Sequence, residues 1–172
     1  MHSLIVGITE SGKTTLCKKL AEKHIEQGYA VLVLTSVFDE WPKGCIVYDD
    51  QDEFLRVFWN SKKCFVFIDE GGTTVGRYNE AMDATATRGR HWGHSCYFSA
   101  QRATQISATV RGQCSQLFCF AQGTKDAEVL AEEFNNVELE KAPDLRQGEF
   151  YLVRRFGHDG EKFCAKLDAF KY

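Results

Sequence analysis

A glycine-containing turn near the N-terminus has the residue types that bind phosphate groups. Residues 7–14 read Gly-Ile-Thr-Glu-Ser-Gly-Lys-Thr and fit the pattern G-x-x-x-x-G-K-[ST]. An apolar segment precedes the turn and an amphipathic segment follows it, so N–H groups of the turn and the start of a helix would face the same oxygens. The pattern therefore predicts a nucleotide-binding loop.

Each position of this loop has an expected role. Lys13 would reach the β- and γ-phosphates, and the hydroxyl of Thr14 would bind Mg²⁺, whose octahedral coordination phosphate oxygens and water complete. Thr15 is expected to make a weaker contact with the α-phosphate. The backbone of the other loop residues would surround the phosphates: Gly7, Ile8, Thr9, Glu10, Ser11 and Gly12. The expected cofactors are ATP and Mg²⁺.

A pair of carboxylates follows the apolar run 64–68. In parallel sheets, ligands bind at the carboxyl ends of strands, so Asp69 and Glu70 should lie beside the phosphate loop. Asp69 would hold Mg²⁺ through a coordinated water, and Glu70 would polarise the water that attacks the γ-phosphate. A carboxylate that activates water favours an ATPase over a nucleotide kinase, because a kinase must exclude water. An acidic, solvent-facing strand end is the other interpretation.

A glutamine and several arginines follow in the next part of the chain. The apolar run 96–100 delivers Gln101 to the same edge, where its amide would hydrogen-bond the γ-phosphate or the attacking water. Four arginines compete for the role of an arginine finger, a guanidinium from a neighbouring subunit that neutralises charge during phosphoryl transfer: Arg88, Arg90, Arg102 and Arg111. Arg88 and Arg90 are favoured because they flank Gly89 at an expected helix end.

Neither the histidines nor the cysteines predict a metal site. His91 and His94 lack a third ligand at suitable spacing. They are expected either at the surface or in contact with functional residues, without binding a ligand themselves. The seven cysteines include no C-x-x-C pair, and several lie inside apolar runs. They are expected to be buried, reduced thiols and not a zinc or disulfide framework.

Strand-like and helix-like segments alternate along the chain. Short apolar runs predict buried strands at 4–6, 30–35, 64–68, 96–99 and 117–121. Apolar periodicity predicts helices at 13–27, 51–59 and 126–134, with 103–113 as a further candidate. This order predicts an α/β fold with a mainly parallel sheet. Residues 149–154 and 162–167 flank His158-Asp159-Gly160 and predict a C-terminal antiparallel hairpin.

Length and composition place limits on the kind of protein. A chain of 172 residues with 44% hydrophobic and 26% charged residues predicts one globular domain over 1–172, with its core in about 1–135 and the hairpin extension in about 148–168. Disorder and fibrous repeats are excluded. No run approaches the roughly 20 apolar residues of a membrane span, and the first residues do not resemble a signal peptide. We therefore expect a cytoplasmic protein with no membrane span.

The charges are unevenly distributed. The net charge of −3 excludes a protein coated with positive charge, so any nucleic acid must bind a local patch. Residues 76–113 carry five arginines against two carboxylates, a net +3, whereas 125–149 carry eight acidic against three basic residues. This asymmetry predicts two differently charged surfaces, with an ordinary solvated face as the alternative. Both the basic stretch and the pair Arg154-Arg155 are candidates for contact with DNA.

In this order, the motifs resemble those of the FtsK/HerA superfamily of P-loop ATPases, above all its minimal viral genome-packaging members. The resemblance rests on residues 7–14, 65–70 and 87–91 and on Tyr97-Phe98-Ser99-Ala100-Gln101-Arg102, and it spans about 1–135. It implies a RecA-like core in which Lys13 and Thr14 bind phosphates and Mg²⁺, Asp69 and Glu70 serve the metal and the water, and Gln101 acts as a sensor.

The resemblance also implies what such a protein does. It implies an ATPase that assembles as a homo-oligomeric ring, a pentamer or hexamer, and translocates double-stranded DNA, as in packaging a viral genome into a preformed capsid. A capsid or membrane-associated protein would dock it, in the host cytoplasm or in the virion. The chain has little length for a separate DNA-binding or anchoring domain, so docking would depend on that partner.

Two other functions fit some of the same motifs. Nucleoside kinases of the thymidine kinase type also combine a phosphate-binding loop with an Asp-Glu-Gly stretch, here residues 69–71, but they usually carry a zinc site of C-x-x-C pairs that this sequence lacks. A nucleotide-switched assembly protein of a virion would share every motif and hydrolyse ATP slowly. Stimulation of ATP hydrolysis by double-stranded DNA separates the motor from both.

Overall fold

The computed structural model describes residues 1–36, 40–69, 79–156 and 163–166, without the side chains of 163–166. Within them, one eight-stranded sheet has the order β3-β2-β4-β5-β1-β6-β7-β8. The strands are β1 (His2–Val6), β2 (Val31–Leu34), β3 (Cys45–Tyr48), β4 (Phe65–Ile68), β5 (Ser95–Ala100), β6 (Cys114–Cys119), β7 (Glu149–Arg154) and β8 (Phe163–Lys166). The strands from β3 to β6 are parallel, whereas β7 and β8 are antiparallel to their neighbours.

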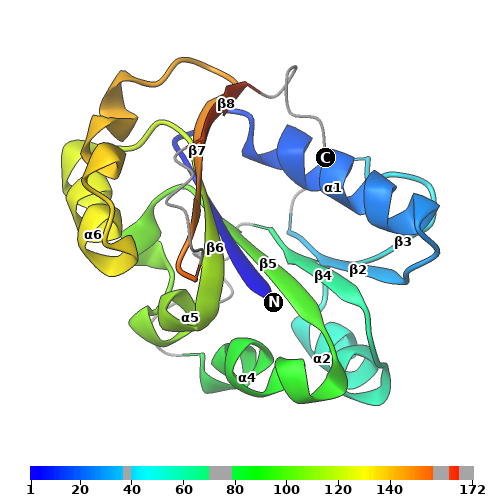
Figure 1. The fold of residues 1–172 in the computed structure, drawn as a ribbon. Helices are drawn as coiled ribbons and strands as arrows, with labels where there is room; N and C mark the ends of the chain where they lie inside the picture. The colour runs from blue at the N-terminus through cyan, green and yellow to red at the C-terminus, as the bar shows by residue number, and fades with distance from the viewer. Residues whose placement is uncertain (37–39, 70–78, 157–162, 167–172) are drawn as a thin grey trace.

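Helices cover both faces of the sheet (Figure 1). They are α1 (Lys13–Glu26), α2 (Gln51–Asn60), α4 (Glu80–Arg88), α5 (Ala108–Gln113) and α6 (Thr124–Phe134), together with the 3₁₀ segments η1 (Gly89–Trp92), η2 (Ala103–Gln105) and η3 (Val137–Asp144). The apolar residues of α1 pack on one face, and those of α2, α4, α5 and α6 pack on the other. This is the layered α/β architecture with a mainly parallel sheet and a C-terminal antiparallel pair that the sequence predicts.

The alternation of side chains along β1 explains why this strand lies in the middle of the sheet. Leu4 and Val6 join the core under α2, α4, α5 and α6, whereas Ile5 joins the core under α1. All three are completely buried, and β1 is paired on both sides, with β5 and β6. The loop that follows β1 is therefore held at the centre of the carboxyl edge of the sheet.

Several element boundaries differ from the sequence prediction. β3 was not predicted, since it is a short edge strand whose Ile46 and Val47 are exposed and which shows no buried run. The helix end expected at Gly89 is the end of α4, whose start was not predicted. The candidate helix over 103–113 is two elements, η2 and α5, because Ile106 has extended backbone and Ser107 caps α5 by accepting a hydrogen bond from the N–H of Val110. β1 begins two residues earlier than expected and β6 three residues earlier.

The C-terminal hairpin extends the main sheet. β7 pairs with β6 and with β8, so the antiparallel strands continue beyond the parallel ones. The turn expected at His158-Asp159-Gly160 lies outside the described residues. No helix among the residues that the structure describes is long and apolar enough to cross a membrane.

Two buried histidines contribute to the packing around the sheet. Burial lowers the pKa of His2 and of His24 to about 4 in each case. The ring of His24 stacks on Phe65 with centroids 3.4 Å apart, and its Nε2 lies 2.9 Å from the hydroxyl of Tyr97. Nδ1 of His2 accepts a hydrogen bond from the N–H of Cys96. Both side chains are thus neutral in the folded protein at neutral pH.

We expect the free energy of unfolding to decrease as the pH falls from 6.5 towards 4. In this window the unfolded chain protonates both histidines whereas the folded chain does not, so acid favours unfolding. Each histidine should contribute about 1–2 kcal/mol of this loss between about pH 7.5 and about pH 5, measured by urea denaturation. His24→Gln should reduce the loss, and His91→Asn, at an exposed site, should leave it unchanged. An unaltered pH dependence in His24→Gln would contradict the assignment.

Candidate functional site

The first residues of the phosphate loop are hydrogen-bonded to strands on both sides of β1. The N–H of Gly7 donates to the carbonyl of Ala100 at the end of β5 (3.3 Å), and the N–H of Ile8 donates to the carbonyl of Ala121 beyond β6 (2.9 Å). A Cβ atom at Gly7 would lie 2.5 Å from both Cβ of Phe120 and Oγ of Ser11. The start of the loop is therefore fixed to the sheet at Gly7, where any side chain larger than that of glycine would clash.

Backbone conformation turns the rest of the loop towards its own centre. Glu10 has φ +62° and Gly12, which precedes α1, has φ +113°. The N–H of Ser11 donates to the carbonyl of Ile8 (3.3 Å) and closes the turn. Left-handed residues among right-handed ones make successive N–H groups converge, and the N-terminus of α1 lies at the same place. This arrangement has the form of an anion-binding site.

Lys13 lies at the open side of this loop. Its ammonium donates a 2.9 Å hydrogen bond to the carbonyl of Ile8, five residues earlier, so the side chain extends across the loop. The side chains of Lys13 and Thr14 are half-buried and that of Thr15 is exposed. Two of the predicted cofactor-binding side chains thus lie at the start of α1, where phosphate oxygens would be held.

Asp69 lies at the same edge of the sheet, at the end of β4. Its N–H donates to the carbonyl of Leu34, and the residue is only 7% exposed. Burial raises the pKa of the Cys17 thiol in α1; the charge of Asp69 raises it further, and that of Lys13 lowers it. The carboxylate and the ammonium therefore lie close to the same turn of α1. Glu70, the predicted catalytic carboxylate, lies outside the described residues.

The oxygens near the start of α1 fit a magnesium ion. Mg²⁺ prefers few protein ligands, a carboxylate or hydroxyl oxygen, with water and phosphate oxygens supplying the rest. Asp69 and Thr14 would provide such oxygens. No group of three or more His, Cys, Asp or Glu side chains capable of holding a metal occurs among the described residues.

Gln101 follows β5 directly and is held beside the loop by two residues that the sequence did not single out. Gln122 is 3% exposed, and its Nε2 donates to the carbonyl of Gln101 (3.1 Å). Asp126 accepts hydrogen bonds from Nε of Arg102 (2.9 Å) and from N–H and Oγ1 of Thr104. Burial disfavours the charged form of Asp126, but the bonds from Arg102 and Thr104 outweigh it and lower its pKa. The Gln101 side chain is exposed at this edge.

The candidate arginine fingers occupy three kinds of position. Arg88 and Arg90 are exposed at the end of α4 and in η1, which lead into the amino end of β5, so they lie at the sheet edge opposite the phosphate loop. The Arg88 guanidinium lies 5.8 Å from the ring centre of Trp59. Arg102 has a side chain 59% exposed beside its own loop. Arg111 is largely buried and bonds Glu133 at 2.7 Å, which makes it a structural residue.

The prediction of two differently charged surfaces is wrong for part of the basic stretch. Arg102 pairs with Asp126, and Arg111 pairs with Glu133, so two of the arginines of 76–113 are neutralised by the acidic segment 125–149. Arg155 is also structural: its guanidinium donates to the carbonyls of Cys114, Glu133 and Arg111. Arg154 is exposed and stays a candidate for contact with DNA, as do Arg88 and Arg90.

His94 and most of the cysteines belong to the interior. Nδ1 of His94 accepts from the N–H of Cys64, and its Nε2 bonds the carbonyl of Phe58, whereas His91 is exposed. Cysteines 17, 64, 96, 114 and 119 are free and buried, and Cys45 is free and half-buried. Burial raises the pKa of Cys45 to about 11. His91 thus has the surface position that the sequence predicts, whereas His94 is buried with both ring nitrogens hydrogen-bonded to the backbone.

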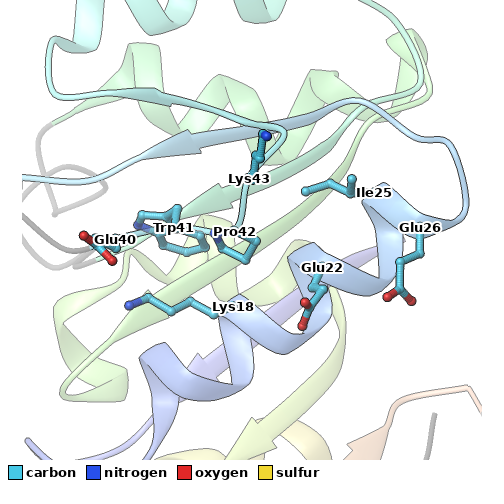
Figure 2. A pocket seen from close by; sticks show the side chains of 8 residues that line it. All are labelled: Lys18, Glu22, Ile25, Glu26, Glu40, Trp41, Pro42 and Lys43. Atoms are coloured by element: carbon cyan, nitrogen blue, oxygen red, sulfur yellow. The ribbon is translucent and has the colours of Figure 1, made fainter.

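Two pockets flank the loop and α1. One, of about 400 Å³, lies between Ile8, Gln122 and the start of α6. The other, of about 470 Å³, lies between α1 and the segment before β3, where Figure 2 shows Trp41 opposite Lys18 and Pro42 opposite Glu22. The first adjoins the phosphate loop and offers space beside it. The second pocket could not be predicted from the periodicity of the sequence. Its walls come from two separate segments, α1 and the residues before β3.

Comparisons with solved structures show that this fold occurs in other proteins. The genome-packaging NTPase B204 of Sulfolobus turreted icosahedral virus 2, in complex with ATP-gammaS, superposes with a TM-score of 0.72 at 18% identity, over 88% of this chain and 91% of that one. The conjugation coupling protein TcpA of pCW3 gives 0.72 and 18%, over 96% and 60%. VirB4 of Thermoanaerobacter pseudethanolicus gives 0.68 and 11%, over 96% and 88%. Neither a family model nor a curated protein matches the sequence.

The chain therefore shares the fold of these three proteins. The resemblance inferred from the motifs is confirmed for the fold, and so is the predicted α/β class. In this fold the loop after β1 and the carboxyl ends of the neighbouring parallel strands lie along one edge of the sheet. Here that edge brings together residues 7–14, Asp69 and Gln101.

Gly7→Ala should disrupt the loop. The new methyl group would meet the buried Phe120 at Cβ, which cannot move away as a flexible side-chain end could, so the loop must shift. We expect the affinity for ADP to fall by about tenfold or more, together with a loss of about 1–3 kcal/mol of stability, measured by calorimetry and urea denaturation. Gly112→Ala is the matched control, because nothing lies within 4 Å of its added methyl in α5. Wild-type ADP affinity in Gly7→Ala would contradict this reading of the loop.

Proposed function

We propose that this chain is an FtsK/HerA-type ATPase that couples ATP hydrolysis to the movement of double-stranded DNA, as in packaging a viral genome into a capsid. The observation that carries the proposal is the convergence of the phosphate loop, Asp69 and Gln101 at one sheet edge. The fold shared with a genome-packaging NTPase and a conjugation coupling protein supports it.

The chain's own residues suggest how hydrolysis would proceed. The loop N–H groups and Lys13 would bind the β- and γ-phosphates and balance the charge that develops on them. Asp69 and Thr14 would hold Mg²⁺, which supplies further charge stabilisation when bound. Glu70 would accept a proton from the attacking water as its oxygen bonds to the γ-phosphorus and ADP leaves. Gln101 would orient that water from the neighbouring strand end.

Assembly into a homo-oligomeric ring, a pentamer or hexamer, completes the proposal. A chain of net charge −3 has little global attraction for DNA, but a ring would place one exposed basic patch per subunit around a single pore. The exposed arginines Arg88, Arg90 and Arg154 are available for such a patch. The motor would work in the host cytoplasm or at the virion and would need a capsid or membrane-associated protein to dock it.

Substitutions of Lys13 and Glu70 test the catalytic assignment. Lys13→Ala should weaken ATP binding by about a hundredfold, because the loop loses its cation. Glu70→Gln should bind ATP normally and reduce kcat by about a hundredfold or more, because the amide cannot accept the proton. Binding is measured by calorimetry and turnover by phosphate release, with and without double-stranded DNA.

Three results would contradict the proposed function or the catalytic assignment within it. Normal hydrolysis by Glu70→Gln would remove this residue as the base. Phosphorylation of a deoxynucleoside with no response to double-stranded DNA would identify a kinase. A very slow, DNA-independent ATPase that never forms rings would identify a nucleotide-switched assembly protein.

Subunit mixing tests Arg88 and Arg90 as trans-acting fingers. Because both lie at the edge opposite their own phosphate loop, they can serve only a neighbouring subunit. Arg88→Ala or Arg90→Ala subunits added to wild type should reduce ATPase activity more than in proportion to their fraction, as each poisons a neighbouring site. Arg56→Ala, in which a side chain 72% exposed on α2 is removed, should only dilute the activity. A proportional loss with both finger variants would exclude them.

A further inference from the structure

A tight turn precedes β7 and is closed by its own end residues. The N–H of Glu149 donates to the carbonyl of Arg146, and the N–H of Arg146 donates to Oε2 of Glu149, both at 3.0 Å. Gly148 occupies the third position with φ +79°, which favours glycine and leaves its N–H pointing out of the turn. The turn therefore presents the Gly148 N–H and the Gln147 side chain outward.

Both groups bond the phosphate loop, from which they are distant in sequence. Nε2 of Gln147 donates to the carbonyl of Glu10 (3.0 Å), and the N–H of Gly148 donates to the carbonyl of Ser11 (2.9 Å). These two carbonyls belong to adjacent residues in the middle of the loop. The turn thus holds the loop by two consecutive peptide groups.

The orientation of these peptides is what a phosphate loop requires. An N–H can face a phosphate only if the carbonyl groups beside it face away from that phosphate, since two oxygens repel each other. Glu10 has φ +62°, a left-handed conformation that costs a non-glycine residue about 1 kcal/mol or more, so its peptide needs support from outside the loop. Donors placed behind the carbonyls of Glu10 and Ser11 supply that support.

We propose that Gln147 is a positioning residue for nucleotide phosphates, acting together with the Gly148 N–H as a clamp on the loop. The proposal rests on the proposed nucleotide binding and adds to it a residue outside every sequence motif. Gln147 acts from behind the loop, through the carbonyl of Glu10. Because Gly148 directly precedes β7, the clamp also joins the phosphate loop to the β7–β8 hairpin.

Gln147→Met tests the clamp because methionine has the same length and no charge but cannot donate. We expect the Kd for ADP to rise about three- to tenfold, the loss of one hydrogen bond that keeps the loop in its binding conformation. KM for ATP should rise in parallel, while kcat at saturating ATP stays unchanged. Without nucleotide, hydrogen exchange of the amides of residues 8–12 should be faster than in the wild type.

Gln113→Met, the same substitution at the end of α5 and at the opposite sheet edge, should change none of these quantities. Gly148→Ala provides a second variant, since the added methyl strains the positive φ, and it should reproduce the weaker ADP binding. Wild-type ADP affinity and loop exchange in Gln147→Met would overturn the inference. If the wild type itself binds no ADP, the proposed function fails, and the exchange rates alone then decide whether the clamp holds the loop.

Discussion

The structure depends on two backbone hydrogen bonds at the carboxyl end of β1. Because Gly7 bonds the carbonyl of Ala100 and Ile8 bonds that of Ala121, the phosphate loop begins as a continuation of three adjacent strands. Gln101 directly follows Ala100, and Gln122 directly follows Ala121. The sheet thus fixes the positions of the side chains that approach the phosphate loop from the ends of β5 and β6. The lack of room for a side chain at Gly7 keeps the loop close to Phe120.

Behind this edge, ion pairs join segments that differ in charge. Arg102 with Asp126 and Arg111 with Glu133 connect the region after β5 to α6. The Asp126 carboxylate is buried and fully engaged, and its bonds with Arg102 and Thr104 hold the segment that carries Gln101. The composition of the basic stretch 76–113 suggests a surface for nucleic acid. In the structure, part of this stretch instead holds Gln101, the candidate sensor. The exposed charges that remain are fewer than the composition of the stretch indicates.

The parts of the site that could be predicted are those with a local signal. The loop pattern, the apolar runs before Gly7 and Asp69, and the alternation of strand and helix all depend on neighbours in the chain, and the fold confirms the arrangement they predict. β3 was missed because its side chains are exposed and it is paired at one edge only. Gln122, Asp126 and Gln147 were missed because their roles depend on partners about 20 to 140 residues away along the chain.

The sequence by itself determined which residues are candidates for phosphate chemistry and predicted a mainly parallel sheet that would bring them to one edge, since residue type and short-range periodicity are local properties. Only the tertiary structure decided which arginines remain exposed, which acidic residues neutralise the others, and which distant turn supports the loop. Those outcomes depend on contacts between segments far apart in the chain, and the free energy of such contacts depends on geometry that only the packed sheet and helices create.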